Sequence, residues 1–219
     1  MKKKDLTLSL LQESAIDFCT EMSKKNHPYL SKATDGKTVG TYVEHKFKEY
    51  LSQRFTVEIG NSADGIDLPG HSINTDIKVT SITQPQSSCP FKNIEQKIYG
   101  LGYNLLVFVY EKKTTKNKCI LHFTHCTFIS SNRTGDYTLT KRLREMLKDD
   151  ANKEDIMAYL QDKGVPGDEL AHGILADKVL SHTPEQGYLT ISNALQWRLQ
   201  YKRVIGLQNT TPGVFNHEW

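Results

Sequence analysis

The sequence has few cysteines and no long hydrophobic run. Its four cysteines among 219 residues form no CxxC pair, so neither a disulfide-stabilised fold nor a zinc site built on such pairs is expected. We expect a protein of the reducing cytoplasm. No apolar stretch approaches the ~18 residues that a bilayer crossing requires, so we expect no membrane partner. Gln12 and Glu13 interrupt the apolar stretch after the lysines at positions 2–4, which argues against a secretion signal.

The motifs of several enzyme classes are also missing. No Gly-x-Ser-x-Gly occurs, so a serine hydrolase is not indicated. Gly100 and Gly102 lack the third glycine and the preceding strand of a dinucleotide-binding loop, and a helix cap is the simpler interpretation. His122, His125 and Cys126 have no second metal-like pair nearby, so we interpret them as ordinary strand residues rather than zinc ligands.

The composition that is present is that of a globular protein. Hydrophobic residues make up 37% of the chain and charged residues 24%. The length fits one domain, or a core with a small appended subdomain. The formal net charge of +3 permits a polyanionic partner without requiring one.

Hydrophobic spacing predicts an α/β fold. Apolar residues three and four apart indicate helices, and alternation or short apolar runs indicate strands. Before residue 135 the predicted helices are 6–24, 40–53 and 93–99, and the predicted strands are 55–59, 66–68, 73–80, 105–110 and 119–124. Beyond it the predicted helices are 138–150, 153–163, 168–181 and 193–201. We therefore expect a mixed central β-sheet of about five strands flanked by helices in residues 1–135, with a helical accessory region in residues 136–219.

Two aspartates and a lysine carry the most specific chemical signal. Asp76 and Lys78 are two residues apart on a predicted strand, so their side chains leave the same face. If His71 and Ser72 form a two-residue turn, Asp67 lies across from Asp76, with Cβ atoms roughly 5 Å apart. Two carboxylates this close repel each other unless a cation lies between them. Mg²⁺ usually takes one or two carboxylates plus water and phosphate oxygens, so the pattern predicts a Mg²⁺ site.

Lys78 and Glu44 extend this predicted site. A lysine beside the ion can orient a hydrolytic water, accept its proton or stabilise the charged transition state. Glu44 lies next to the apolar seam of predicted helix 40–53, where its carboxylate can act as a further metal ligand or orient one. A solvated strand face and a surface glutamate are the simpler interpretations of these residues. Asp64 is an alternative to Asp67 as the first acid, although the hairpin pairing favours Asp67.

Asp67, eight intervening residues and Asp76-Ile77-Lys78 resemble the signature of the PD-(D/E)XK nucleases. The order of predicted elements in residues 40–125 is similar to the core of that superfamily, and the compact size most resembles a type II restriction endonuclease. The sequence departs from the signature in having isoleucine before the first acid and aspartate as the second acid. The resemblance implies Mg²⁺-dependent phosphodiester hydrolysis in duplex DNA. It also implies that Asp67 and Asp76 bind the metal, that Lys78 positions the water and that Glu44 is auxiliary.

Several segments carry candidate DNA contacts. Loop 84–90 offers amides and hydroxyls that can read base edges, and turn 112–118 offers lysines for phosphates. Helix 93–99 resembles the family helix that packs on the active-site face, and segment 190–203 resembles a recognition helix in places but equally a core helix. The candidate DNA-binding residues are Gln84, Gln86, Ser87, Ser88, Lys92, Gln96, Lys97, Arg198, Lys202 and Arg203.

The sequence thus favours a Mg²⁺-dependent type II restriction endonuclease that cuts a specific, palindromic duplex sequence. A homodimer is expected, because one such site hydrolyses one strand and a palindrome matches two-fold protein symmetry. The first alternative is a structure-specific repair or junction-resolving nuclease of the same fold. The second is a DNA-binding protein whose acidic face is inert.

Overall fold

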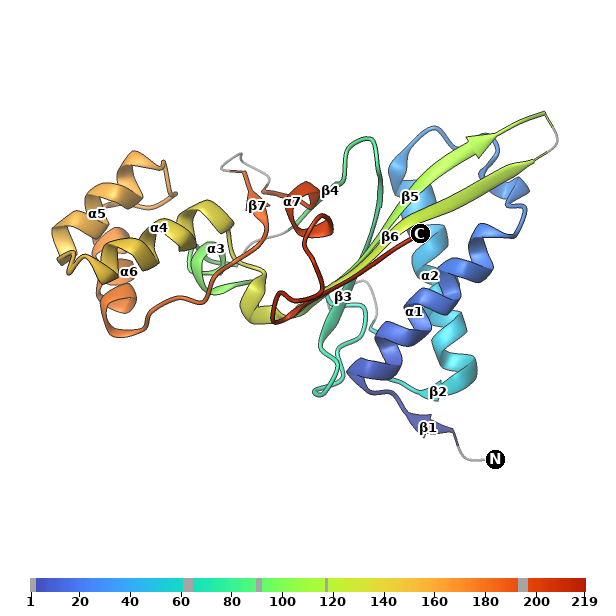
Figure 1. Cartoon of the computed structure of the whole chain (residues 1–219), viewed down its shortest axis with the longest axis horizontal. Helices are drawn as coiled ribbons and strands as arrows, with labels where there is room; N and C mark the ends of the chain where they lie inside the picture. The colour runs from blue at the N-terminus through green and yellow to red at the C-terminus, as the bar shows by residue number, and fades with distance from the viewer. Residues whose placement is uncertain (1–2, 61–64, 90–91, 117, 193–196) are drawn as a thin grey trace. The chain divides into compact units, whose positions relative to one another are not determined.

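The computed structural model describes residues 3–60, 65–89, 92–116, 118–192 and 197–219. The chain forms two compact units that interleave along the sequence (Figure 1). The first, here called the core unit, contains Met1–Ser87, Tyr103–Ile129 and Ile205–Trp219; the second, the helical unit, contains Ser88–Gly102 and Ser130–Val204. The sequence pattern predicts one boundary near residue 135, whereas the chain passes between the units four times.

Two long helices of the core unit begin at side-chain caps. Helix α1 spans Leu8–Ser23, and the Thr7 hydroxyl accepts a hydrogen bond from the Leu10 N–H. Helix α2 spans Gly36–Arg54, and the Asp35 carboxylate accepts one from the Thr38 N–H at 2.7 Å. Both helices are predicted from the sequence, but α2 begins four residues earlier because Asp35 caps it. A short 3₁₀ turn, Pro28–Leu30, lies between them.

A four-stranded mixed sheet forms the centre of the core unit. Its strands lie in the order β3 (Thr75–Ser81), β5 (Asn104–Thr114), β6 (Cys119–Ile129) and β9 (Val214–Glu218). β3 and β5 are parallel, and the other two pairs are antiparallel. The mixed α/β class is therefore confirmed. The predicted strand 55–59 is limited to β2 (Phe55–Thr56), which pairs with β1 (Lys4–Asp5).

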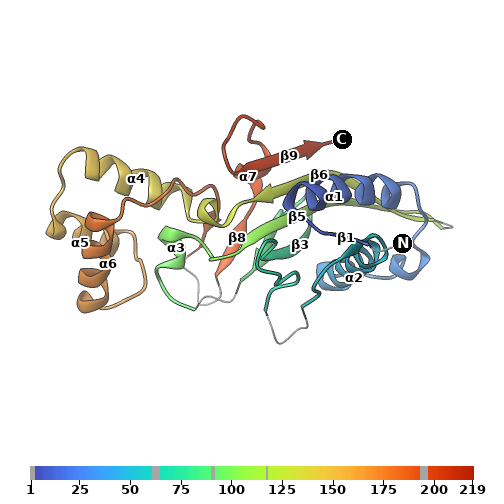
Figure 2. The ribbon, with the colours of Figure 1, turned by 90° about the horizontal axis from the view of Figure 1, so that it is seen from below.

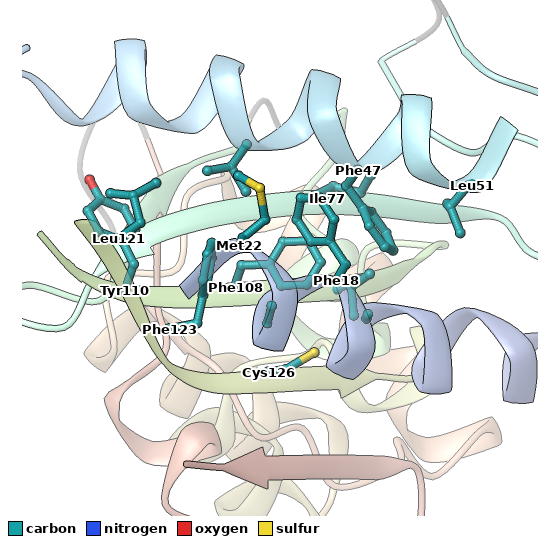
Figure 3. Close-up of a cluster of buried hydrophobic side chains, with 14 of the residues drawn as sticks. Phe18, Met22, Phe47, Leu51, Ile77, Phe108, Tyr110, Leu121, Phe123 and Cys126 are labelled. Carbon is teal, nitrogen blue, oxygen red and sulfur yellow. The ribbon is translucent and has the colours of Figure 1, made fainter. Parts of the chain in front are cut away.

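The main hydrophobic core lies between the two long helices and the sheet. α1 packs along β6 and α2 packs along β3 (Figure 2). Phe18 of α1 and Phe47 of α2 have ring centroids 5.0 Å apart, and Phe47 meets Phe108 of β5 edge-on at the same separation (Figure 3). Edge-to-face aromatic contacts of this kind add to the free energy gained by burial. This packing fixes α2 against β3. The polar side chains that lie where these two elements meet are held in place with them.

The helical unit contains three longer helices that the sequence predicts correctly. They are α4 (Tyr137–Lys148), α5 (Lys153–Asp162) and α6 (Glu169–Ser181), and they share a core with the short helix α3 (Gln96–Tyr99). β7 (Thr190–Ile191) pairs with β8 (Arg198–Gln200) in an antiparallel ladder. β4 (Gln86–Ser88) and α7 (Lys202–Ile205) lie where the chain passes between the units.

The predicted helix 193–201 is wrong over its described part. Arg198 and Gln200 are exposed while Leu199 and Tyr201 are buried, which is the two-residue period of a strand. Leu199 pairs with Ile191 across the β7–β8 ladder. Residues 193–196 lie outside the described part of the chain. Among the described helices, none has the length and apolar character that a bilayer crossing requires.

Candidate active site

The turn before β3 sets the register of the two predicted acids. The Ile73 N–H donates to the Gly70 carbonyl at 2.8 Å, and Leu68 and Thr75 exchange two backbone hydrogen bonds of 3.0 Å each. Leu68 and Ile73 are buried in the core, which holds this hairpin in place. The predicted pairing of residue 68 with residue 75 is therefore confirmed, and the next residue outward, Asp67, lies across from Asp76. Asp64, the alternative first acid, lies outside the described residues.

Asp67 is held beside β3 by two hydrogen bonds to its carboxylate. Its Oδ2 accepts from the Ile77 N–H at 2.8 Å, and its Oδ1 accepts from Lys48 Nζ at 2.5 Å. Burial raises the pKa of Asp67, but the hydrogen bonds from Asp76, Lys48 and Ile77 together lower it below its usual value. Asp67 is the charged member of the carboxyl pair.

Asp76 is the member whose pKa is raised. Its side chain is almost fully buried, with 5% of the residue exposed. Burial, with a smaller contribution from Asp67, raises the pKa of Asp76 from 3.8 to about 7. The Lys78 ammonium lowers this pKa, but by less than burial raises it. Lys78 Nζ lies 2.6 Å from Asp76 Oδ2. Asp76 therefore ionises after Asp67, and a cation bound between the two carboxylates would favour its charged form.

Lys48 is a site residue that the sequence reasoning missed. Its Nζ lies 2.8 Å from Glu44 Oε1 and 2.5 Å from Asp67 Oδ1, and these two bonds raise its pKa although burial alone would lower it. Glu44 and Lys48 are four residues apart on α2, a spacing that places them on one side of a helix. That spacing is the signal that could have identified Lys48. Glu44 and Asp67 thus form ion pairs with the same lysine, Lys48.

The arrangement fits a small hard cation. No group of three or more His, Cys, Asp or Glu side chains suited to a metal occurs within the described ranges. Mg²⁺ does not need such a group, since it keeps several waters and usually takes one or two carboxylates plus substrate phosphate. Asp67 and Asp76 would supply that donor set, and a cation between them would favour the charged form of Asp76 that burial disfavours.

Comparison with known proteins shows the family. The family model described as "Type II restriction enzyme NspV" matches residues 5–216. The chain belongs to this family. It is 47% identical over 211 residues to the type II restriction enzyme NspV of Nostoc sp., with 95% of each chain covered. It is therefore a type II restriction endonuclease, a site-specific endodeoxyribonuclease, as the resemblance of its acids and lysine predicts.

A solved structure is also similar to this restriction endonuclease. It is described as the crystal structure of tetrameric restriction endonuclease SfiI bound to cognate DNA. The two share 10% identity with a TM-score of 0.40, over all of this chain and 89% of that chain.

The loop after β3 offers exposed polar groups on a fixed backbone. The Thr80 hydroxyl accepts from the Gln86 N–H at 3.0 Å and lies within hydrogen-bond distance of the Gln84 and Gln86 carbonyl oxygens. Gln84 and Ser88 are exposed, and Gln86 and Ser87 are half-buried. Base contacts by these four residues stay a prediction for this enzyme.

Helix α3 carries two of the candidate DNA-binding residues, Gln96 and Lys97. The Gln96 side chain is used inside the unit, accepting from the Lys92 N–H at 2.8 Å and donating to the Leu101 carbonyl at 2.9 Å. Lys97 is only 4% exposed, and burial lowers its pKa although the Asp136 carboxylate opposes this. A DNA contact by Lys97 stays a prediction for this enzyme, although its side chain is almost fully buried within the helical unit. Lys92 is exposed.

The three basic candidates near residue 200 are exposed, although not on a recognition helix. Arg198 lies on β8, and Lys202 and Arg203 lie on α7. The Arg203 guanidinium lies 3.9 Å from the centroid of the Tyr137 ring, which holds it in a cation–π contact. These cations stay candidates for phosphate contact.

Proposed function

We propose that this restriction endonuclease hydrolyses duplex DNA with Mg²⁺ held by Asp67 and Asp76, with Lys78 as the catalytic lysine and Glu44 as an auxiliary acid. The observation that supports this most is the carboxyl pair itself. Asp67 lies across from Asp76 beyond the Leu68–Thr75 bridge, and Lys78 Nζ lies 2.6 Å from Asp76 Oδ2. Two facing carboxylates can hold a hard cation such as Mg²⁺, and a lysine beside them can stabilise the charge that develops on the phosphate.

Each side chain has a role that follows from its position. When bound, Mg²⁺ supplies a Lewis acid for the phosphate and lowers the pKa of a coordinated water. Lys78 leaves the same strand face as Asp76, so its ammonium is placed to hydrogen-bond the attacking water or the phosphate oxygens. The Ile77 N–H orients Asp67 from the β3 backbone, and Lys48 orients it from α2.

Lys48 acts in this proposal as a positioning residue. Lys48→Met should lower the cleavage rate about 10–100-fold, the usual cost of losing a partner that orients a metal ligand. Lys48→Arg should recover most of the rate, because a guanidinium can still donate to both Glu44 and Asp67. Cleavage rates at saturating Mg²⁺, with circular dichroism to confirm folding, measure both effects. Equal rates for Lys48→Met and the parent would contradict the role.

We infer a homodimer and a palindromic target from the same chemistry. One carboxyl pair with one lysine serves one strand, so cutting both strands of a duplex at one site needs two copies of the chain. Two-fold symmetry of the protein then matches two-fold symmetry in the DNA. We place the activity in the cytoplasm, where the four buried thiols stay reduced.

The lysine turn between β5 and β6 is a proposed phosphate-binding segment. Lys113, Lys116 and Lys118 are exposed there, whereas Lys112 Nζ donates to the Ala33 carbonyl of its own unit at 2.5 Å. Replacing the three exposed lysines with alanine should reduce the log–log salt slope of DNA binding by about one unit for each phosphate that the turn neutralises in the parent. Lys112→Ala is the matched control and should leave the slope unchanged. An unaltered slope in the triple variant would remove this turn from the interface.

Digestion of one long DNA of known sequence tests the proposed function. With Mg²⁺ we expect discrete fragments whose ends map to one short palindrome, and with a chelator we expect none. A continuous smear, or cleavage only at junctions and mismatches, would favour the structure-specific alternative. Binding without cleavage at any Mg²⁺ concentration would favour the non-catalytic one.

A further inference from the structure

The hairpin that brings the two acids together is short, and its tip is exposed. Between Asp67 and Asp76 the two arms form the Leu68–Thr75 bridge, whose two backbone hydrogen bonds are 3.0 Å each. Residues 71–72 at the tip are exposed to solvent. A two-stranded hairpin by itself is marginally stable in water. Contacts from outside the hairpin are therefore needed to keep Asp67 across from Asp76.

The turn of this hairpin contains a backbone conformation that needs support. Asn74 has a φ of 34°, in the left-handed region that residues other than glycine seldom adopt. Asparagine tolerates this region better than most residues, but the conformation persists only where the surroundings hold it. The N–H groups of Asn74 and Ile73 both donate to the Gly70 carbonyl, at 2.7 Å and 2.8 Å. The carbonyls of the same two residues are hydrogen-bonded to β3 and β5 instead.

Asn104, the first residue of β5, donates to both of these carbonyls. Its N–H donates to the Asn74 carbonyl at 2.8 Å, and its side-chain amide donates to the Ile73 carbonyl, also at 2.8 Å. The Thr75 hydroxyl donates to the same Ile73 carbonyl at 2.6 Å. Thr75 pairs with Asn104 in the parallel β3–β5 ladder, and Asp76 is the next residue of β3. The turn between the two acids is thus tied to the strand beside β3.

We propose that Asn104 is a positioning residue for DNA cleavage, which acts through the backbone of the turn to keep Asp67 and Asp76 in the geometry that Mg²⁺ requires. This inference rests on the proposed function, in which these two carboxylates hold the metal. Mg²⁺ demands nearly ideal octahedral geometry, so a small displacement of one carboxylate weakens its binding. Groups that orient metal ligands accordingly affect metal affinity although they do not bind the metal.

Asn104→Leu removes the side-chain donor at nearly constant size. The Mg²⁺ concentration that gives half-maximal cleavage should rise about tenfold, the lower end of what losing an orienting group costs in metal affinity. Hydrogen exchange at the Ile77 N–H, measured on the full chain without DNA or metal, should become faster. That N–H donates to Asp67 Oδ2, so its exchange reports directly on whether the hairpin holds Asp67 in place.

Asn216→Leu is the matched control. Asn216 lies on β9, at the opposite edge of the same sheet, and donates its side-chain amide to the Leu207 carbonyl at 2.7 Å. Its loss should lower the free energy of unfolding, measured with urea, but leave the Mg²⁺ dependence and the Ile77 exchange rate at parental values. If Asn104→Leu behaved like Asn216→Leu in these two measurements, Asn104 would have a structural role alone and the proposal would be overturned.

The second donor to the same carbonyl allows a further test. Thr75→Val removes the hydroxyl at nearly constant size and leaves the Asn104 donor in place. The double variant removes both donors from the Ile73 carbonyl, so its Mg²⁺ requirement should rise by more than the product of the two single effects. Effects that simply multiply would show that the two side chains act independently, which contradicts the proposal.

These measurements separate the role of Asn104 from the proposed function. An Asp76→Asn variant that cleaved at the parental rate would contradict the metal site itself. If Asp76→Asn were inactive while Asn104→Leu kept the parental Mg²⁺ dependence, only the role of Asn104 would be overturned, whatever the exchange rate at Ile77.

Discussion

Asp76→Asn is expected to reduce the rate of DNA cleavage by at least about 10³-fold, or about 4 kcal/mol of transition-state stabilisation. The asparagine amide can still donate to Asp67, so the hairpin register should persist, but one of the two proposed metal-binding carboxylates is removed. Lys78→Ala should cause a comparable reduction, since its ammonium lies 2.6 Å from Asp76. Single-turnover cleavage of an oligonucleotide duplex that contains the target, at saturating Mg²⁺, measures both effects.

Two further measurements make this result specific to the site. Asp17→Asn alters an exposed aspartate of α1 and should cleave at the parental rate. Target DNA should still bind to Asp76→Asn, because the candidate base-reading groups lie on other segments. If Asp76→Asn and Lys78→Ala both cleaved at parental rates, the active-site assignment would be wrong, although the family would stand.

The metal-free enzyme should become less stable as the pH rises from about 4 to about 7. In this window folded Asp76 keeps a proton that the unfolded chain releases, because burial raises its pKa from 3.8 to about 7. The folded state therefore loses free energy relative to the unfolded state as pH increases, and the loss is complete above pH 7. The pKa difference sets an upper limit of about 4 kcal/mol. Asp76→Asn removes this titration and should be the more stable protein at pH 8.

Urea unfolding with a chelator at pH 5 and pH 8 measures this effect. The difference in unfolding free energy between Asp76→Asn and the parent should grow with pH, and Asp17→Asn should show no such trend. Adding Mg²⁺ at pH 8 should stabilise the parent but not Asp76→Asn, because a ligand that binds only the folded state stabilises it by mass action. A difference that does not change with pH would show that Asp76 is already ionised in the folded protein.

The parts of the fold that local patterns determine could be predicted from the sequence. The spacing of apolar residues identifies α1, α4, α5 and α6, and continuous apolar character identifies the buried part of β5. The pairing of residue 68 with residue 75 follows from one short turn, so the juxtaposition of Asp67 and Asp76 could be predicted as well. These features depend only on neighbours within about ten residues.

The parts that depend on distant contacts could not be predicted. β9 pairs with β6 across a long stretch of sequence, and its five residues carry no strong strand pattern of their own. β8 is three residues long, too short to be told from a helix by periodicity. Lys97 is buried by the packing around α3, and its position in the sequence does not reveal this burial. Lys48 acquires its role only when α2 packs on β3.

The place of β9 in the sheet affects the order in which a growing chain can complete this fold. β3 and β9 occupy opposite edges of the sheet, so the edge that carries Asp76 can form before the other is covered. Roughly 85 residues separate β6 from β9, which a ribosome translates in about 4–17 seconds. Until then, residues His125–Ile129 of β6 lack the strand that covers them, and such bare edges readily pair with other chains. Closure of the sheet is therefore a late, non-local event in the maturation of the nuclease.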